Sequence, residues 1–220
     1  MVDISKVDLV ARAREVIVRE AQGIQALADQ LDAGLADVID LLLKCRGHVL
    51  VTGAGTSHAM AQRFAHLLSC SGTPALCINA ADSLHGGAGA VTADDVVFII
   101  SKGGHSAEVN QFADIAHARG AKIVAQTENP GSPLGQISDA VFKVKAVGDV
   151  DPYGMIATGS SLVNGAAGDA LCVLLLELRG YSRVPRGTQH FGMTHPGGAV
   201  GKKLATDATS AASTMEAEGR

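Results

Sequence analysis

Residues 48–58 read HVLVTGAGTSH, and the architecture of the chain can be predicted outward from them. The apolar, β-branched run at 49–51 predicts a short buried strand, and a helical pattern of apolar residues begins at Ala59. Gly53 permits a tight turn between the two. Because the N-terminus of a helix offers free N–H groups and the positive end of its dipole, an anion fits there, and a phosphate fits best. The residues of this predicted site are Gly55, Thr56 and Ser57.

Other glycine motifs can be weighed against this turn. A dinucleotide fingerprint requires a third glycine and an acidic residue after the next strand, but the chain has His58 and the run ALCIN at 75–79 instead. A Walker loop requires Gly-Lys-Ser/Thr, which does not follow. An ordinary strand-to-helix turn capped by Ser57 remains open as the alternative without a ligand.

The length, composition and charge of the chain limit the classes of protein to which it can belong. The chain has 220 residues, which suits one generous α/β domain, and its 3% aromatic content predicts a core of Ala, Val, Leu and Ile. The net charge of −4 comes without basic clusters, so no nucleic-acid partner is expected. The N-terminus lacks the pattern of a signal peptide, and the longest apolar run, near 170–176, is too short to span a bilayer. We expect a soluble, cytoplasmic protein without a membrane partner.

The cysteines and histidines give no sign of a metal site. The cysteines form no C-x-x-C pair, and neither residue type has the spacing of a metal centre. No metal and no cofactor are therefore predicted, and the cysteines are interpreted as small buried hydrophobes in a reducing compartment. They are Cys45, Cys70, Cys77 and Cys172.

The rest of the chain alternates between helix and strand patterns. Apolar periodicity predicts helices from residue 3 to about 45, broken near Gly34, with more apolar surface than one sheet face needs, so a subunit interface is expected there. Further strands are predicted at 75–78, 96–100, 123–125 and 141–144, and further helices at 59–70, 106–119, 132–138 and 159–178. This alternation predicts an α/β fold, a five-stranded parallel, doubly wound sheet flanked by helices. The predicted parts are N-terminal helices (1–45), the main domain (46–204) and a disordered tail (205–220).

A second loop rich in glycine and serine follows the third predicted strand. Residues 101–106 read SKGGHS, and Glu108 lies in the first turn of the next predicted helix. In a sheet of order 2-1-3-4-5 the first and third strands are neighbours, so the two loops face each other at the topological switch point. Their hydroxyl groups and helix-start amides can then converge on one phosphate. The second loop contributes Ser101, Gly104 and Ser106.

Six passages together resemble the sugar isomerase (SIS) family, and especially its arabinose-5-phosphate isomerase branch, from about residue 40 to 204. They are TGAGTSHAMAQ, SGTPALCINAADSLHGG, FIISKGGHSAE, SPLG, the SSLVN…GDAL helix and HPGGAVGKKL. Their order and spacing are more specific than any one glycine motif. The resemblance implies a SIS fold, a homodimer or homotetramer, and an aldose–ketose isomerase acting on a sugar phosphate.

The resemblance also implies roles for single residues. Glu108 matches the acidic base of the family, His85 and His195 match active-site histidines, and Asp149 falls where the branch carries a glutamate. The first-loop residues and the second-loop serines match phosphate-binding positions.

The chain departs from the pattern of this branch in three places, and these differences bear on the identity of the substrate more than on the class of reaction. The branch usually has a lysine where this chain has Thr56, and Gly103 replaces the second serine of its S-x-S-G loop. The tandem CBS domains that often follow in that branch are not expected, since the sequence ends shortly after HPGGAVG.

The implied reaction assigns chemistry to these side chains. A carbonyl moves between C1 and C2 when a base takes a proton from one carbon and returns it to the other through a cis-enediol, and Glu108 is the predicted base. Otherwise Glu108 is only a helix-start carboxylate that satisfies the dipole. His85 and His195 are predicted to transfer protons as the sugar ring opens, or else they are surface histidines.

Two other functions stay open. One is a non-catalytic phosphosugar-binding sensor or regulator, and the other is a SIS-type sugar-phosphate lyase. A sensor would need the phosphate loops but not Glu108, His85 and His195, so their presence favours an enzyme. The HPGGAVG stretch favours the isomerase branch over the lyase.

Overall fold

The computed structural model describes residues 4, 7–148, 150–180, 194–199, 201–203 and 206. Within them lies a five-stranded parallel sheet of order β2-β1-β3-β4-β5. The strands are β1 (Val49–Gly53), β2 (Ala75–Cys77), β3 (Val96–Ile100), β4 (Lys122–Thr127) and β5 (Ala140–Lys143). The predicted fold class and strand order are confirmed.

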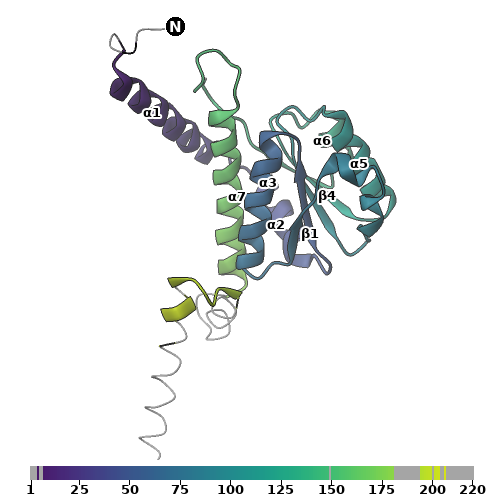
Figure 1. Cartoon of the computed structure of the whole chain (residues 1–220). Coiled ribbons are helices and arrows are strands. Elements are labelled where there is room, and N and C mark those ends of the chain that lie inside the picture. The colour runs from purple at the N-terminus through teal and green to yellow at the C-terminus, as the bar shows by residue number, and fades with distance from the viewer. Residues whose placement is uncertain are drawn as a thin grey trace, which may run out of the picture.

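Helices cover both faces of this sheet (Figure 1). On one face lie α2 (Gly34–Lys44), α3 (Thr56–Cys70) and α7 (Thr158–Leu178), and α1 (Leu9–Ala28) packs against α7. On the other face lie α4 (Ala80–Ser83), the short 3₁₀ helix η2 (Gly87–Ala90), α5 (Ala107–Ala118) and α6 (Pro133–Ile137). In Figure 1, α7 stands beside α3, while the first turns of α1 reach away from the sheet.

The strands are buried because both faces are covered. In β1 the side chains of Val49 and Val51 enter the core under α2, α3 and α7, whereas Leu50 enters the core under α5 and α6. All five residues of β3 are buried in the same alternating way. Near-continuous apolar strands are what a parallel sheet with two covered faces requires.

The leading helices separate as predicted, but α1 keeps most of its apolar residues outside the core. Gly23 and Leu27, near its C-terminal end, are its buried residues. Ahead of them Val10 is 66% exposed and Ile17 is 64% exposed. This exposed surface agrees with the prediction that the leading helices carry more apolar area than one sheet face needs.

The structure differs from the predicted elements in several places. Helix α3 begins at Thr56, three positions before Ala59, because the polar first turn carries no apolar periodicity that would reveal it. The short α4 and η2 were not predicted for the same reason. Among the cysteines only Cys172 is buried, and the other three are partly exposed, so the interpretation of all four as buried is wrong.

One described helix is long and apolar enough, by length and composition alone, to cross a membrane. It is α7, although a core helix of a soluble protein passes the same test. The run near 170–176 that was predicted to be too short for a bilayer is only the apolar second half of this helix, which also includes the small residues before it. Val163, Leu171 and Leu175 pack into the core on the sheet.

Of the predicted tail at 205–220, the described part is residue 206. The predicted part boundaries and the cytoplasmic location stay predictions.

Candidate active site

The two predicted phosphate loops leave the sheet side by side. Strands β1 and β3 are paired in parallel, and Gly53 at the end of β1 is opposite Ile100 at the end of β3. The chain then enters α3 on one face of the sheet and α5 on the other. This divergence is the topological switch point at which open α/β sheets bind ligands.

Glycine is required where the first loop leaves the strand. A Cβ atom on Gly53 would lie 2.8 Å from the carbonyl oxygen of Ile100 and 2.9 Å from the carbonyl carbon of Ser57, so no larger residue fits. Gly55 is the N-cap of α3 and has a φ of 59°. The turn places Thr56 and Ser57 in the first helical turn, with the Ser57 N–H donating to the Ala54 carbonyl at 3.1 Å.

The second loop is fixed by contacts with α5 and α6. Gly104 has a φ of 70°, and a Cβ atom there would lie 2.0 Å from Ser132 Oγ. The Gly104 carbonyl accepts a hydrogen bond from Asn110 Nδ2 at 3.2 Å, and the same amide group donates to the Ser106 carbonyl at 3.0 Å. Ser101 is buried, and its N–H donates to the Gln126 carbonyl at 3.0 Å. These contacts within the chain define the shape of the loop.

The helices differ in whether a side chain caps their first turn. Asp8 caps α1, Asn79 caps α4 and Ser132 caps α6, each through its side chain. The N-cap residues of α3, α5 and α7 provide no such bond. Since the first N–H groups of a helix need acceptors, these three helices can offer theirs to an anion or to a sugar oxygen.

Glu108 lies in the first turn of α5, directly after the second loop. It is partly buried. Within the described residues its carboxylate makes no hydrogen bond or ion pair. A carboxylate without a protein partner at the start of a helix is free to accept a proton from a ligand held by the neighbouring loop.

The predicted histidines lie elsewhere on the chain. His85 is exposed in the turn after α4, where its N–H donates to the Asp82 carbonyl at 3.0 Å. His195 Nε2 lies 3.3 Å from the Sγ atom of Cys70, which is the last residue of α3. Because the phosphate loop is at the first residue of this 15-residue helix, His195 is about 20 Å away from it in the same chain. Asp149 lies outside the described residues.

Sequence reasoning missed a cavity next to the second loop. It has a volume of about 270 Å³ and lies between Lys102, the loop after β5 and the first turn of α7. Asp151 shapes its wall, because its carboxylate accepts the N–H groups of Tyr153, Met155 and Ile156. The same hydrogen bonds, led by that from Tyr153, lower the pKa of Asp151. The lysine in SKGGHS was the one visible signal of this cavity in the sequence.

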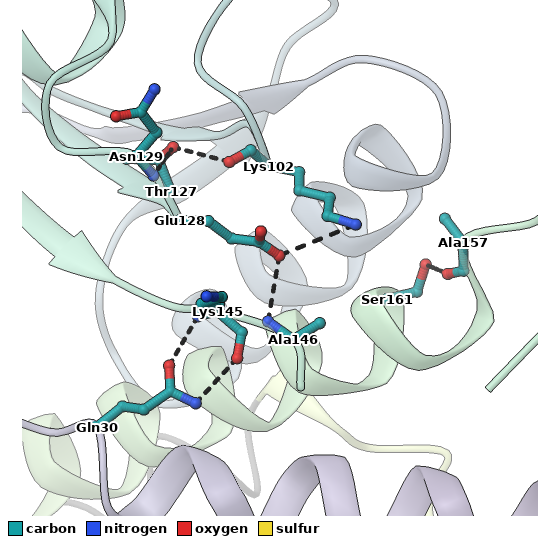
Figure 2. A network of polar contacts seen from close by, with 9 residues as sticks. All are labelled: Gln30, Lys102, Thr127, Glu128, Asn129, Lys145, Ala146, Ala157 and Ser161. Carbon is teal, nitrogen blue, oxygen red and sulfur yellow. Dashed lines mark hydrogen bonds and ion pairs between the residues drawn. The ribbon is translucent and has the colours of Figure 1, made fainter. Parts of the chain in front are cut away.

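A polar network connects this cavity to the sheet and to α1 (Figure 2). The ammonium of Lys102 lies 4.0 Å from Glu128 Oε1, which also accepts the Ala146 N–H at 3.2 Å. Gln30, just after α1, exchanges two hydrogen bonds of 2.9 Å with the backbone of Lys145. The loop beside the cavity is thereby held from two sides. The described residues contain no group of three or more His, Cys, Asp or Glu that could hold a metal ion.

The sequence of the chain is similar to those of known proteins. The chain is 30% identical over 199 residues to the arabinose 5-phosphate isomerase KpsF of Escherichia coli, covering 90% of this chain and 61% of the relative. It is 30% identical over 197 residues to the arabinose 5-phosphate isomerase KdsD of Pseudomonas aeruginosa, covering 90% of this chain and 59% of the relative. The chain thus spans about three fifths of the length of these curated relatives.

Solved structures agree in fold. A candidate sugar-phosphate isomerase from Listeria monocytogenes superposes with a TM-score of 0.82 at 28% identity, covering 90% of this chain and 100% of the other. The E. coli CFT073 protein c3406, solved in complex with arabinose 5-phosphate, superposes with a TM-score of 0.81 at 27% identity, covering 87% and 99%. The family model described as SIS domain matches residues 41–174. The chain belongs to the SIS domain family.

Proposed function

We propose that the protein is a phosphosugar isomerase that interconverts an aldose phosphate and a ketose phosphate through a cis-enediol, with arabinose 5-phosphate as the first substrate to test. The observation that carries this proposal is the position of Glu108. Its carboxylate, without a partner among the described residues, follows a loop whose shape depends on Gly104, where a Cβ atom would lie 2.0 Å from Ser132 Oγ. Relatives named arabinose 5-phosphate isomerase, and a structural neighbour solved with that sugar phosphate, support the choice of substrate.

The proposed reaction has two parts at the switch point, which are the binding of the phosphate and the transfer of a proton. The phosphate binds the uncapped N-termini of α3 and α5 together with the hydroxyl groups of Ser57, Ser101 and Ser106. With the phosphate fixed, Glu108 takes a proton from C1 or C2 and returns it to the neighbouring carbon. A SIS-type lyase or a sensor would share the phosphate site, and the absence of any isomerised product would favour one of them.

We further propose that the protein acts as a homodimer or homotetramer whose sites are completed across subunits. His195 is at the far end of α3 from its own phosphate loop, and His85 is exposed on the surface. His195 can therefore serve Glu108 only from another chain, and His85, on the exposed turn between α4 and η2, is placed to contact a neighbouring subunit. The exposed apolar residues of α1 offer a surface for such an assembly.

The experiment that tests the proposed function compares phosphorylated and free sugars. Arabinose 5-phosphate should be converted to its ketose isomer, observed by NMR, whereas free arabinose should be neither bound nor converted. Ser57→Ala combined with Ser101→Ala should weaken binding by about 1.5–3 kcal/mol for each charge-assisted bond lost. Equal affinity for the two sugars in calorimetry would contradict the phosphate site, and binding without conversion of any C4 to C7 sugar phosphate would contradict the isomerase.

A further inference from the structure

The cavity beside the second glycine loop has the composition of a ligand subsite. Its volume of about 270 Å³ is just below the range for small-molecule sites, which starts at about 300 Å³. Lys102 lines one side, and Thr158, Gly159 and Ser160 of α7 line the other. Because Lys102 directly follows Ser101, the cavity adjoins the predicted phosphate site. A ligand whose phosphate binds the glycine loops can extend into it.

The backbone of Lys102 is fixed, whereas its ammonium group is not. The Lys102 carbonyl accepts hydrogen bonds from Thr127 Oγ1 and from the Glu128 N–H, each at 3.0 Å. The ammonium is 4.0 Å from Glu128 Oε1, beyond the 2.7–2.9 Å, approximately, of a charge-assisted hydrogen bond. The side chain is 62% exposed. The ammonium is thus kept near the cavity by Glu128, with N–H donors left for a ligand.

The opposite wall carries polar groups that lack partners. Thr158 Oγ1 is buried and has no hydrogen-bond partner among the described residues. Ala157, the N-cap of α7, provides no side-chain bond to the first N–H groups of the helix. Figure 2 shows the Lys102 side chain extending toward this end of α7, where Ala157 and Ser161 are drawn. A buried hydroxyl without a partner is costly unless a ligand or water completes it.

The charges around the cavity favour a neutral group over a second phosphate. The positive charge of Lys102 is balanced by Glu128 at 4.0 Å. The Asp151 carboxylate adds negative charge to the lining, although its hydrogen bonds go to backbone N–H groups of its own loop. A dianion would meet both carboxylates, whereas hydroxyl and carbonyl oxygens would use the available donors without that repulsion.

We propose that this cavity binds the hydroxyl- and carbonyl-bearing end of the sugar phosphate, and that Lys102 donates a hydrogen bond to an oxygen of the reacting carbons. This inference rests on the proposed function and adds a residue to it. The ammonium stabilises the negative charge that develops on the carbonyl oxygen as the adjacent carbon loses its proton to Glu108. The hydroxyl of Thr158 fixes the sugar chain on the other side.

The test separates the sugar end from the phosphate end. Lys102→Met removes the charge and keeps the length, and it should lower kcat/KM for arabinose 5-phosphate at least tenfold. The same variant should change the affinity for inorganic phosphate less than twofold. Lys102→Arg should recover part of the activity, and Lys143→Met, an exposed lysine at the end of β5, should behave as the wild type. Wild-type turnover in Lys102→Met, or an equal loss of affinity for phosphate and for arabinose 5-phosphate, would overturn the proposal.

The Thr158→Val variant provides a second test, which distinguishes a role of Thr158 in ligand binding from a purely structural role. Removing a buried hydroxyl that has no protein partner should leave the thermal midpoint of the free protein unchanged or higher. The affinity for arabinose 5-phosphate should nevertheless fall several-fold, while that for inorganic phosphate stays the same. A lower midpoint together with unchanged affinity would assign Thr158 to the fold and overturn its role in the cavity.

Failure of this inference can be distinguished from failure of the proposed function. If the wild type converts no sugar phosphate, the isomerase is wrong, and the subsite is then judged by binding alone. A loss of affinity in Lys102→Met for arabinose 5-phosphate but not for inorganic phosphate would still support the subsite. Unchanged affinity for both would overturn it.

Discussion

At the scale of single residues, the two glycines of the second loop make a sharp comparison. Gly104→Ala places a Cβ atom 2.0 Å from Ser132 Oγ at a φ of 70°, so the change is both crowded and strained. It should cost about 2–4 kcal/mol of unfolding free energy, measured by urea denaturation, and should weaken phosphate binding. Gly103→Ala is the control, because its nearest contact would be 3.9 Å from His105 Cδ2. Equal stability of the two variants would contradict the described loop.

The conformation of single residues could be predicted from the sequence where glycine marks a tight turn, whereas their proposed roles stay predictions. Gly55 and Gly104 both have positive φ values at the ends of neighbouring strands, as the two glycine loops suggested. That Lys102 and Thr158 line the same cavity could not be predicted. The two residues are more than fifty positions apart in the sequence, and their proximity depends on how α7 packs against the sheet. The predictions for Glu108 and His85 came from family resemblance, which no local pattern could replace.

At the scale of elements, Asp95 connects the starts of β1 and β3. Its carboxylate accepts the His48 N–H and the Thr92 N–H, each at 2.7 Å, and the Thr92 hydroxyl at 2.9 Å. Burial raises the pKa of Asp95, but these hydrogen bonds from His48 and Thr92 lower it by more, so its pKa lies below the ordinary value. The charged carboxylate therefore stabilises the strands on which both phosphate loops depend.

The expected consequence can be measured as a function of pH. Asp95→Asn should lower the unfolding free energy at pH 7 by about 1–3 kcal/mol. Because the folded pKa is lowered, the contribution is complete above the ordinary value of about 3.9 and disappears as the pH falls through the lowered value. The difference between wild type and variant should therefore shrink below about pH 4. Asp94→Asn, which alters an exposed pair with Arg46, should show a smaller effect, and a constant difference down to pH 2 would contradict this account.

The strands and helices that are rich in apolar residues could be predicted from the sequence, whereas polar segments of the same elements could not. β1 and β3 are buried throughout and were readable as apolar runs, and the break between α1 and α2 was marked by Gly34. The start of α3 was misplaced because Thr56, Ser57 and His58 are polar residues, and none of them is buried in the core. Polar first turns of helices are therefore the places where apolar periodicity is least informative.

For the whole molecule, the proposed role of His195 requires more than one chain. In a dimer that shares sites, coexpression of His85→Ala chains with Glu108→Gln chains should yield mixed dimers with one intact site. Random pairing would then restore about a quarter of the wild-type activity, although each variant alone is nearly inactive. The same experiment with His195→Ala tests the residue at the far end of α3. A monomer in sedimentation velocity, or no gain on coexpression, would contradict shared sites.

Glu108 is proposed to transfer a proton between two carbons of a bound sugar phosphate. The most direct measurement is deuterium incorporation at C1 or C2 of arabinose 5-phosphate in D₂O, followed by NMR for the wild type and for Glu108→Gln. We predict that the wild type exchanges the proton, and that Glu108→Gln still binds the substrate but exchanges it about 10²–10⁴-fold more slowly. If Glu108 serves only the dipole of α5, the variant will exchange at nearly the wild-type rate, and the account is wrong.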